Sequence, residues 1–327
     1  MSRPAHRKGM KRPVDLLEPS SSPKQLDPYS QAPSAETVYS SAIYPSMSLS
    51  LPETCCFLTA TRDHPLHLRD LLVPTIRASY PLINPQTEKY LSPHSLLFFR
   101  DDPNKFVAGA ISQLSFFDLH RPGEPPMLDL KTIPTRRSPQ TASTMRGIIS
   151  ALAINEGVLA AGTFSRQVGL YDKSGTGDTI GTFTVDGEGG GITQLLWSMC
   201  GRYLYVAERR SDAVAVYDVR VAGVKVESFA PRAAETNQRM GVDVAYALGG
   251  EVVAGGTDGM VSVWKPGEGG AKAAEWKAHE DVVGSAVVHP TGVVMATCSG
   301  SRKLGILDED DDTWGKGWEN SLKVWAL

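Results

Sequence analysis

Short runs in which apolar and polar residues alternate occupy most of the chain after residue 36, and Gly, Asp and Asn turns separate them. The clearest stretch is residues 191–264, where one pattern occurs twice in succession. Each copy holds an apolar run, a Gly-containing turn, a run ending in small residues, a tight turn with an aspartate, and a run ending in an aromatic residue. Alternation over such short spans predicts half-buried strands rather than helices.

A repeating unit of three or four short strands is typical of the blades of a β-propeller. One blade cannot bury both of its faces alone, so blades stack around a ring. Six such units are recognisable, and we predict an all-β WD-repeat β-propeller over residues 36–327, either six-bladed or a truncated seven-bladed ring. Residues 1–35 are rich in Pro, Ser and Lys/Arg, and we expect a disordered basic tail there.

The third run of each unit ends at a position that recurs along the chain. The residues at these positions are Asp70, Asp118, Asp172, Asp218, Lys265 and Ala326. They are roughly 46 to 61 residues apart, longer than the about 40–45 residues of a WD repeat, as loop insertions would make them. The sixth unit holds only three runs, and we expect the N-terminal region to supply its fourth strand and close the ring.

Composition narrows the class of protein further. A hydrophobic share of 41% is enough for a core, and a net charge of -3 means that any RNA contact must come from a local basic patch. No apolar run approaches the about 18 residues of a membrane-spanning helix, and the N-terminus lacks the apolar region of a secretory signal. The cysteines are Cys55, Cys56, Cys200 and Cys298. They lack zinc spacing, and we expect reduced, buried thiols in an intracellular protein.

Several stretches go beyond the generic repeat pattern. They are CFLTATRDHPLHLRD (56–70), HSLLFF (94–99), FFDLHRPG (116–123), FSRQVGLYD (164–172), residues 190–220, ETNQRMGVDV (235–244) and GGTDGMVSVW (255–264). In this order they resemble the telomerase Cajal body protein family, which comprises WD-repeat scaffolds for small nuclear RNAs. Its fungal relatives are associated with the nucleus and with pre-mRNA splicing. The family has a further blade before the region that corresponds to residue 37, and this sequence lacks it.

This resemblance implies a non-catalytic nuclear scaffold that binds a telomerase, guide or spliceosomal RNA. It implies small nuclear or guide RNA and ribonucleoprotein proteins as partners, a monomer within the particle, and no cofactor, membrane or small-molecule substrate. The alternative is a protein-only interaction adaptor, because propellers serve many unrelated ends.

Basic residues at related places in successive repeats are candidates for RNA contact. They are Arg166, Arg209, Arg210, Arg239, Arg302 and Lys303. Arg166, Arg209 and Arg210 lie near the ends of second strands, and the last two of the set occupy the corresponding place in the sixth unit. Equivalent positions share one face of a ring, where guanidinium groups can bind phosphates and stack on splayed bases. Arg239 opens a strand, and we expect it at the other end of its blade. An ordinary charged rim is the alternative.

Other conspicuous residues have structural interpretations. Asp63, Asp212 and Asp258 occupy the tight turns, where a carboxylate accepts backbone N–H groups, with acid–base catalysis as the alternative. His279 lies where WD repeats often place a buried histidine that locks a blade. No nucleophile elbow, phosphate loop or converging metal ligands are visible, so we predict neither a catalytic nor a metal site. The acidic run at 308–312 is a solvated loop or a docking loop for a basic partner.

Overall fold

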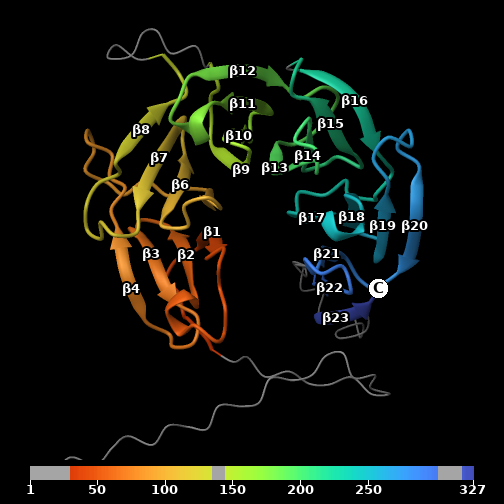
Figure 1. The fold of residues 1–327 in the computed structure, drawn as a ribbon, viewed down its shortest axis with the longest axis horizontal. Coiled ribbons are helices and arrows are strands. Elements are labelled where there is room, and N and C mark those ends of the chain that lie inside the picture. Colours follow the sequence, from red (N-terminus) through yellow and green to blue (C-terminus); the bar gives the residue numbers. More distant parts are fainter. Residues whose placement is uncertain (1–29, 135–143, 222, 301–318) are drawn as a thin grey trace, which may run out of the picture.

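The computed structural model describes residues 30–134, 144–221, 223–300 and 319–327. Within these ranges the strands form six antiparallel sheets around a central opening (Figure 1). The prediction of an all-β, WD-type propeller with six blades is therefore confirmed. Residues 1–29, which include most of the expected tail, lie outside the described residues, as do Arg302, Lys303 and the acidic run at 308–312.

Each blade is a meander whose strands pair in sequence order. Blade one contains β1 (Val38–Ile43), β2 (Cys56–Thr61), β3 (Leu66–Asp70) and β4 (Ile76–Tyr80), and blade two contains β5 (Ser95–Phe98), β6 (Lys105–Ala110), β7 (Gln113–Asp118) and β8 (Leu128–Lys131). Blade three contains β9 (Ile149–Asn155), β10 (Val158–Thr163), β11 (Gln167–Tyr171) and β12 (Thr179–Thr184), and blade four contains β13 (Ile192–Trp197), β14 (Tyr203–Glu208), β15 (Val214–Asp218) and β16 (Val224–Phe229). Blade five contains β17 (Val242–Ala245), β18 (Glu251–Gly255), β19 (Met260–Trp264) and β20 (Lys272–Lys277), and blade six contains β21 (Val283–Val288), β22 (Val294–Ser299) and β23 (Ser321–Ala326). Short 3-10 helices, η1 (Pro52–Thr54), η2 (Lys173–Gly175) and η3 (Tyr246–Leu248), lie in the connections.

Successive side chains of the central strands point to opposite faces of a blade, so they pack into the apolar cores on both sides of it. In β14, Leu204 and Val206 pack into the cluster shared with blade three, whereas Tyr205 and Ala207 pack into the cluster shared with blade five. Successive strand residues point to opposite faces, so a strand covered on both sides is apolar along its whole length. This explains why the second strands are nearly continuous apolar runs.

Apolar clusters between neighbouring blades hold the propeller together. Five clusters join blade one to two, two to three, three to four, four to five, and five to six. In the part of the chain that the structure describes, no cluster joins blade six to blade one, and the two blades stand apart in Figure 1. Each sheet is thus stabilised by the neighbours that cover it.

The meander brings two kinds of loop to one face of the ring, which we call the turn face. The first kind joins the second and third strands of a blade, and the second kind joins the last strand of a blade to the first strand of the next. Backbone hydrogen bonds tie them together: Arg210 N–H donates to Thr236 O at 2.9 Å, and Thr257 N–H donates to Ala233 O at 2.8 Å. Equivalent turns of blades one to five therefore lie on this face.

The first described strand, β1, pairs with β2 in blade one, as expected, and blade six has three strands among the described residues. Because residues 1–29 lie outside the described part of the chain, a fourth strand from the N-terminal region stays a prediction. One expectation from the sequence needs correction. The thiols are free, but only Cys55 and Cys56 are buried, whereas Cys200 and Cys298 are exposed. Cys200 lies in a turn between strands. Cys298 alternates with the buried Thr297, and so it points to the side of blade six that no described blade covers.

Blade six is held by a chain of polar side chains around His279, which is buried (1% exposed). Its Nδ1 lies 2.7 Å from Glu319 Oε1, and its Nε2 lies 2.8 Å from the hydroxyl of Thr297. The indole N–H of Trp325 donates to the same hydroxyl at 2.9 Å. In the neutral imidazole, Nδ1–H donates to the carboxylate and Nε2 accepts from Thr297. This network of hydrogen bonds links β22, β23 and the connection that precedes β21.

The carboxylate of Glu319 gains more from its hydrogen bonds than it loses by desolvation. Burial opposes ionisation, but hydrogen bonds from Ser321, the backbone N–H of Glu280, Lys323 and His279 outweigh it and hold the pKa of Glu319 far below its usual 4.5. The charged form is therefore more stable in the folded than in the unfolded chain.

Replacing Thr297 by Val should destabilise the protein, because the hydroxyl that serves both the imidazole and the indole is lost at nearly constant volume. The buried Nε2 of His279 and the half-buried indole N–H of Trp325 are left unpaired, at up to about 1–3 kcal/mol for each. Urea unfolding measures the change, and Thr291→Val, at an exposed turn, is the control. Equal stability of the two variants would contradict the structural role of the hydrogen bonds around His279.

The contribution of ionised Glu319 should depend on pH. Because the folded-state pKa is depressed, the stabilisation is complete above pH 4.5 and is lost as the pH falls below it. The difference in unfolding free energy between wild type and Glu319→Gln should be largest near neutral pH and should shrink below pH 4.5. Chemical unfolding from pH 3 to 7 tests this, with the exposed Glu280→Gln as the control; a difference that stays constant would refute it.

Candidate nucleic-acid interface

The turns after β10 and β14 carry three of the candidate arginines. Arg166 follows β10, and Arg209 and Arg210 follow β14, so all three lie on the turn face. Arg166 and Arg210 have left-handed backbones, with φ of 63° and 50°. The common face required of an RNA-binding surface is present, but the three side chains differ in what they contact.

Arg166 is engaged in an ion pair between two blades. Its Nε and Nη2 donate to the two carboxylate oxygens of Glu208 at 2.7 and 3.0 Å, and its Nη1 donates to Gly187 O at 2.6 Å. Glu208 is 5% exposed and Arg166 21% exposed. This bidentate pair joins blade three to the end of β14, so the guanidinium has few donors left for a ligand.

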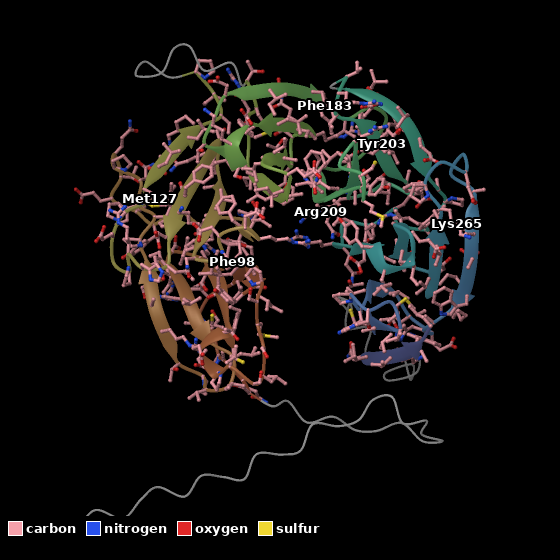
Figure 2. The ribbon with its side chains drawn as sticks, in the orientation of Figure 1. Phe98, Met127, Phe183, Tyr203, Arg209 and Lys265 are labelled. Atoms are coloured by element: carbon pink, nitrogen blue, oxygen red, sulfur yellow. The ribbon has the colours of Figure 1, made fainter. Side chains whose placement is uncertain are left out.

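Arg209 and Arg210 have no such acceptor in the next blade. The residue equivalent to Glu208, directly after β18, is Gly256, which has no side chain. Among the described residues neither arginine makes an ion pair. Arg210 is exposed, and Arg209 is half-buried at the border of the central opening (Figure 2).

Arg239 lies on the turn face, and the expectation that it would lie at the other end of its blade is wrong. It belongs to the connection from β16 to β17, and such connections return to the face of the tight turns. One guanidinium N–H donates to Thr193 O at 2.7 Å. The positive charges of Arg209 and Arg239 are close enough for Arg209 to lower the pKa of Arg239, after the larger effect of burial.

Aromatic rings join the arginines into one group. The rings of Tyr39 and His94 stack at a centroid distance of 4.3 Å, and His94 meets Phe164 edge to face at 5.9 Å. The guanidinium carbon of Arg209 lies 4.6 Å from the centroid of the Phe164 ring, in cation–π geometry. These residues and Arg239 form what we call the channel-mouth cluster, and they come from blades one, three and four and two of the connections.

Backbone hydrogen bonds hold the members of the channel-mouth cluster in place. His94 N–H donates to Gly109 O, Phe164 N–H donates to Ile148 O, and Arg209 N–H donates to Gly191 O, at 3.0 to 3.1 Å. At Gly191 (φ 112°) a Cβ would lie 2.6 Å from the Phe164 carbonyl oxygen, so only glycine allows this close approach. The rings therefore project from a rigid base.

A cavity of about 350 Å³ lies beside the channel-mouth cluster, against the first strands of blades one to four. Tyr39, His94 and Arg239 line it, together with Gln194 and serine residues of β1, β5 and β9. Both polar atoms of the Gln194 amide are hydrogen-bonded to the backbone of Val242. Arg239 is the one charged residue of the described chain that lines the cavity, so its potential is positive.

The local field is positive although the whole chain is slightly acidic. Burial, and then the charges of Arg209 and Arg239, lower the pKa of His94, which favours the neutral imidazole. Arg232 is 3% exposed beneath the turn face, and burial lowers its pKa to about 10, partly offset by Asp212. It remains charged at neutral pH. An anion is the ligand that such a site favours.

The turn aspartates differ in their contacts. Asp258 accepts the N–H of Met260 at 3.0 Å, the i to i+2 bond of an Asx turn. Asp212 accepts the N–H of Ala234, in the following connection, at 2.5 Å. Asp63 is exposed and has a φ of 55°, and its Oδ2 lies 3.5 Å from Nε of Arg62. In the described ranges no three His, Cys, Asp or Glu residues are placed to hold a metal ion, and no helix there is long and apolar enough to cross a membrane.

The aromatic half of the cluster was missed in the sequence. Tyr39, His94 and Phe164 lie in three different units, with 55 and 70 positions between them by their numbers. A signal was present, because Phe164 and Arg209 are the first residues after β10 and β14. Equivalent positions of adjacent blades are neighbours in a propeller, so aligning the units would have paired this ring with this guanidinium.

Comparison with known proteins places the chain among relatives. No family model matches it. Over 305 residues it is 29% identical to guanine nucleotide-binding protein negative regulator 1 of Schizosaccharomyces pombe, covering 89% of this chain and 75% of that protein. It is 28% identical to telomerase Cajal body protein 1 of Bos taurus and of Homo sapiens, over 285 and 296 residues. These matches cover 85% and 88% of this chain and 50% and 51% of those proteins.

The chain is a homologue of the telomerase Cajal body proteins. The resemblance drawn from the sequence motifs is thereby confirmed over most of the chain. This homologue spans about half the length of the telomerase Cajal body proteins that it matches.

Arg166→Gln and Arg210→Gln are a matched pair of variants, since both positions have left-handed backbones in equivalent turns. They compare the loss of stability when an ion-paired arginine and an exposed arginine are removed. Removing Arg166 leaves the carboxylate of Glu208 buried and unpaired, which should cost about 3–5 kcal/mol. Removing the exposed Arg210 should change stability by less than about 0.5 kcal/mol. Denaturant unfolding measures both, and similar losses would contradict the assignment of roles.

Proposed function

We propose that this protein is a non-catalytic nuclear scaffold that binds single-stranded segments of a small nuclear RNA on its turn face. It would act as a monomer within a ribonucleoprotein, without a cofactor, small-molecule substrate or membrane. The observation that carries the proposal is the channel-mouth cluster, in which unpaired guanidinium groups adjoin aromatic rings. The relatives named telomerase Cajal body protein 1 support the nuclear and ribonucleoprotein part.

The chemistry of the cluster suits an unpaired strand better than a duplex. A-form helices hide their base edges in a deep, narrow groove, whereas loops and single strands offer bases that stack on aromatic rings and guanidinium planes. Stacking contributes about 1–3 kcal/mol per base, and arginine adds phosphate contacts. The guanidinium of Arg209 lies on the ring of Phe164, so it could stack on a base as well as bind a phosphate. Arg210, the next residue, is exposed and could bind a further phosphate.

RNA binding should depend strongly on salt. For single strands, log K should fall against log salt with a slope of about -0.7 per phosphate contact. The double change Arg209→Ala/Arg210→Ala should weaken binding of 12-nucleotide RNAs and make the slope shallower by about 1.4, if each arginine contacts one phosphate. Fluorescence anisotropy with labelled RNA from 50 to 300 mM KCl measures both quantities.

The control for this experiment removes the same charge from the opposite face of the same blade. Arg202 and Arg220 lie in the turns at that face, and Arg202→Ala/Arg220→Ala should leave affinity and slope close to those of the wild type. No binding by the wild type, or equal losses in the two double variants, would remove RNA from the function of the turn face. Sequencing of RNAs cross-linked to the protein in cells then assigns a telomerase, guide or spliceosomal RNA.

A cavity on the opposite face favours the second candidate function, a protein-only adaptor. Its volume is about 660 Å³, and Met199, Tyr203, Val216 and Val226 line it between blades four and five. Apolar clefts with methionine suit side chains of a protein partner. Purification from cells with and without ribonuclease separates the candidates: partners that persist after digestion and are lost in Met199→Glu favour the adaptor, and partners lost on digestion favour the RNA scaffold.

A further inference from the structure

We infer that the cavity beside the channel-mouth cluster binds one unpaired nucleotide of the RNA, with its base against the aromatic rings and its phosphate on Arg209 and Arg239. This inference rests on the proposed function and adds a site within it. It gives Tyr39, His94 and the cavity a role in binding. Contacts to the phosphates of the RNA alone would not need these residues.

The cluster carries positive charge that no described carboxylate balances. Arg209 and Arg239 come from different connections, and repulsion from Arg209 contributes to the lowered pKa of Arg239. Neither makes an ion pair within the described ranges, and the Nε of Arg209 is buried without a hydrogen-bond partner there. An anion placed between two like charges on a rigid scaffold reduces the repulsion between them.

The donors of Arg239 are arranged to hold such an anion. The contact between its Nη2 and Thr193 O, at 2.7 Å, fixes the guanidinium beside the cavity. No second hydrogen bond of this guanidinium is found among the described residues, and Arg239 is exposed and lines the cavity. A planar guanidinium binds phosphate oxygens in bidentate fashion, so a phosphate group fits the available donors.

The aromatic rings and the cavity size indicate a base next to that phosphate. Tyr39 and His94 both line the cavity, and their rings stack on one another at a centroid distance of 4.3 Å, so an aromatic pair is present at its wall. At about 350 Å³ the cavity falls within the about 300–1,000 Å³ typical of sites that enclose small molecules. Inorganic phosphate alone would leave these rings and most of the volume unused.

The base should be held by stacking more than by edge recognition. Many of the polar groups in the cavity already have protein partners: Ser95 and Ser150 donate to backbone carbonyls at 2.9 and 2.5 Å, and both amide atoms of Gln194 are engaged. Stacking tolerates every base, because each has a π face. We therefore expect only modest preference among the four nucleotides.

The test uses the full chain, four homopolymeric 12-nucleotide RNAs, and Tyr39→Ala and Arg239→Gln as variants on different elements. Each change should weaken binding by about 5- to 100-fold, the range of a lost stacking contact. Tyr39→Ala should leave the salt slope unchanged, since no phosphate contact is removed, whereas Arg239→Gln should make it shallower by about 0.7. Tyr90→Ala and Arg146→Gln, at exposed positions outside the cavity, should bind as the wild type does.

A second measurement identifies the ligand chemistry directly. The four nucleoside monophosphates, ribose 5-phosphate, inorganic phosphate and phosphotyrosine compete with labelled RNA for the wild-type protein. Nucleotides should compete at least about 5-fold better than ribose 5-phosphate, and Tyr39→Ala should abolish that difference. Equal competition by ribose 5-phosphate would overturn the base site, and stronger competition by phosphotyrosine would assign the cavity to a phosphopeptide.

Failure of this inference differs from failure of the proposed function. If the RNAs bind with a steep salt dependence that Arg209→Ala/Arg210→Ala reduces, while Tyr39→Ala and Arg239→Gln have no effect, the scaffold function stands and the nucleotide site is refuted. If no RNA binds to the wild type, both are refuted. Circular dichroism of each variant confirms that it is folded before binding is measured.

Discussion

Mutual covering of sheets is the constraint on which the rest of this structure depends. A four-stranded blade has two apolar faces, and residues such as Leu204 and Tyr205 alternate between the cores on its two sides. Burial contributes about 25 cal/mol per Å² of apolar surface, and each blade obtains it only from its neighbours. The blades must therefore stand radially, with their loops at the two ends of the strands. Position in the repeat then determines which face a residue occupies.

The same constraint decides which arginines remain available. Arg166 reaches the carboxylate at the end of the next blade's second strand, because Glu208 is there to accept it. For Arg209 and Arg210, one blade further, the corresponding residue is Gly256, which offers no carboxylate. Repetition of the backbone thus positions similar side chains, while a single substitution in the neighbouring blade determines whether a guanidinium is a structural brace or a free donor.

The alternation of the sequence predicted the fold well because strand faces and turns are local properties. It predicted less of the site, since contacts between blades join residues that are distant in sequence. The misplacement of Arg239 has a simple origin: its position was judged from its own strand, whereas the antiparallel meander returns every fourth strand to the turn face. The pairing of Tyr39 with His94 could not be predicted from either unit alone, because it depends on the angle between blade one and the connection to blade two.

A rigid base holds the guanidinium groups of Arg209 and Arg239 near one another, although neither makes an ion pair in the part of the chain that the structure describes. Phe164 and Arg209 are anchored by backbone hydrogen bonds and by the close approach at Gly191, which limits how far the turn that carries Arg209 can move away from Arg239. Solvent and salt screen the repulsion between exposed charges of this kind. A bound phosphate would replace this screening with direct contacts, and preorganised donors lose little entropy when they bind. The inter-blade packing that stabilises the propeller therefore also fixes the donors on which the proposed phosphate contact depends.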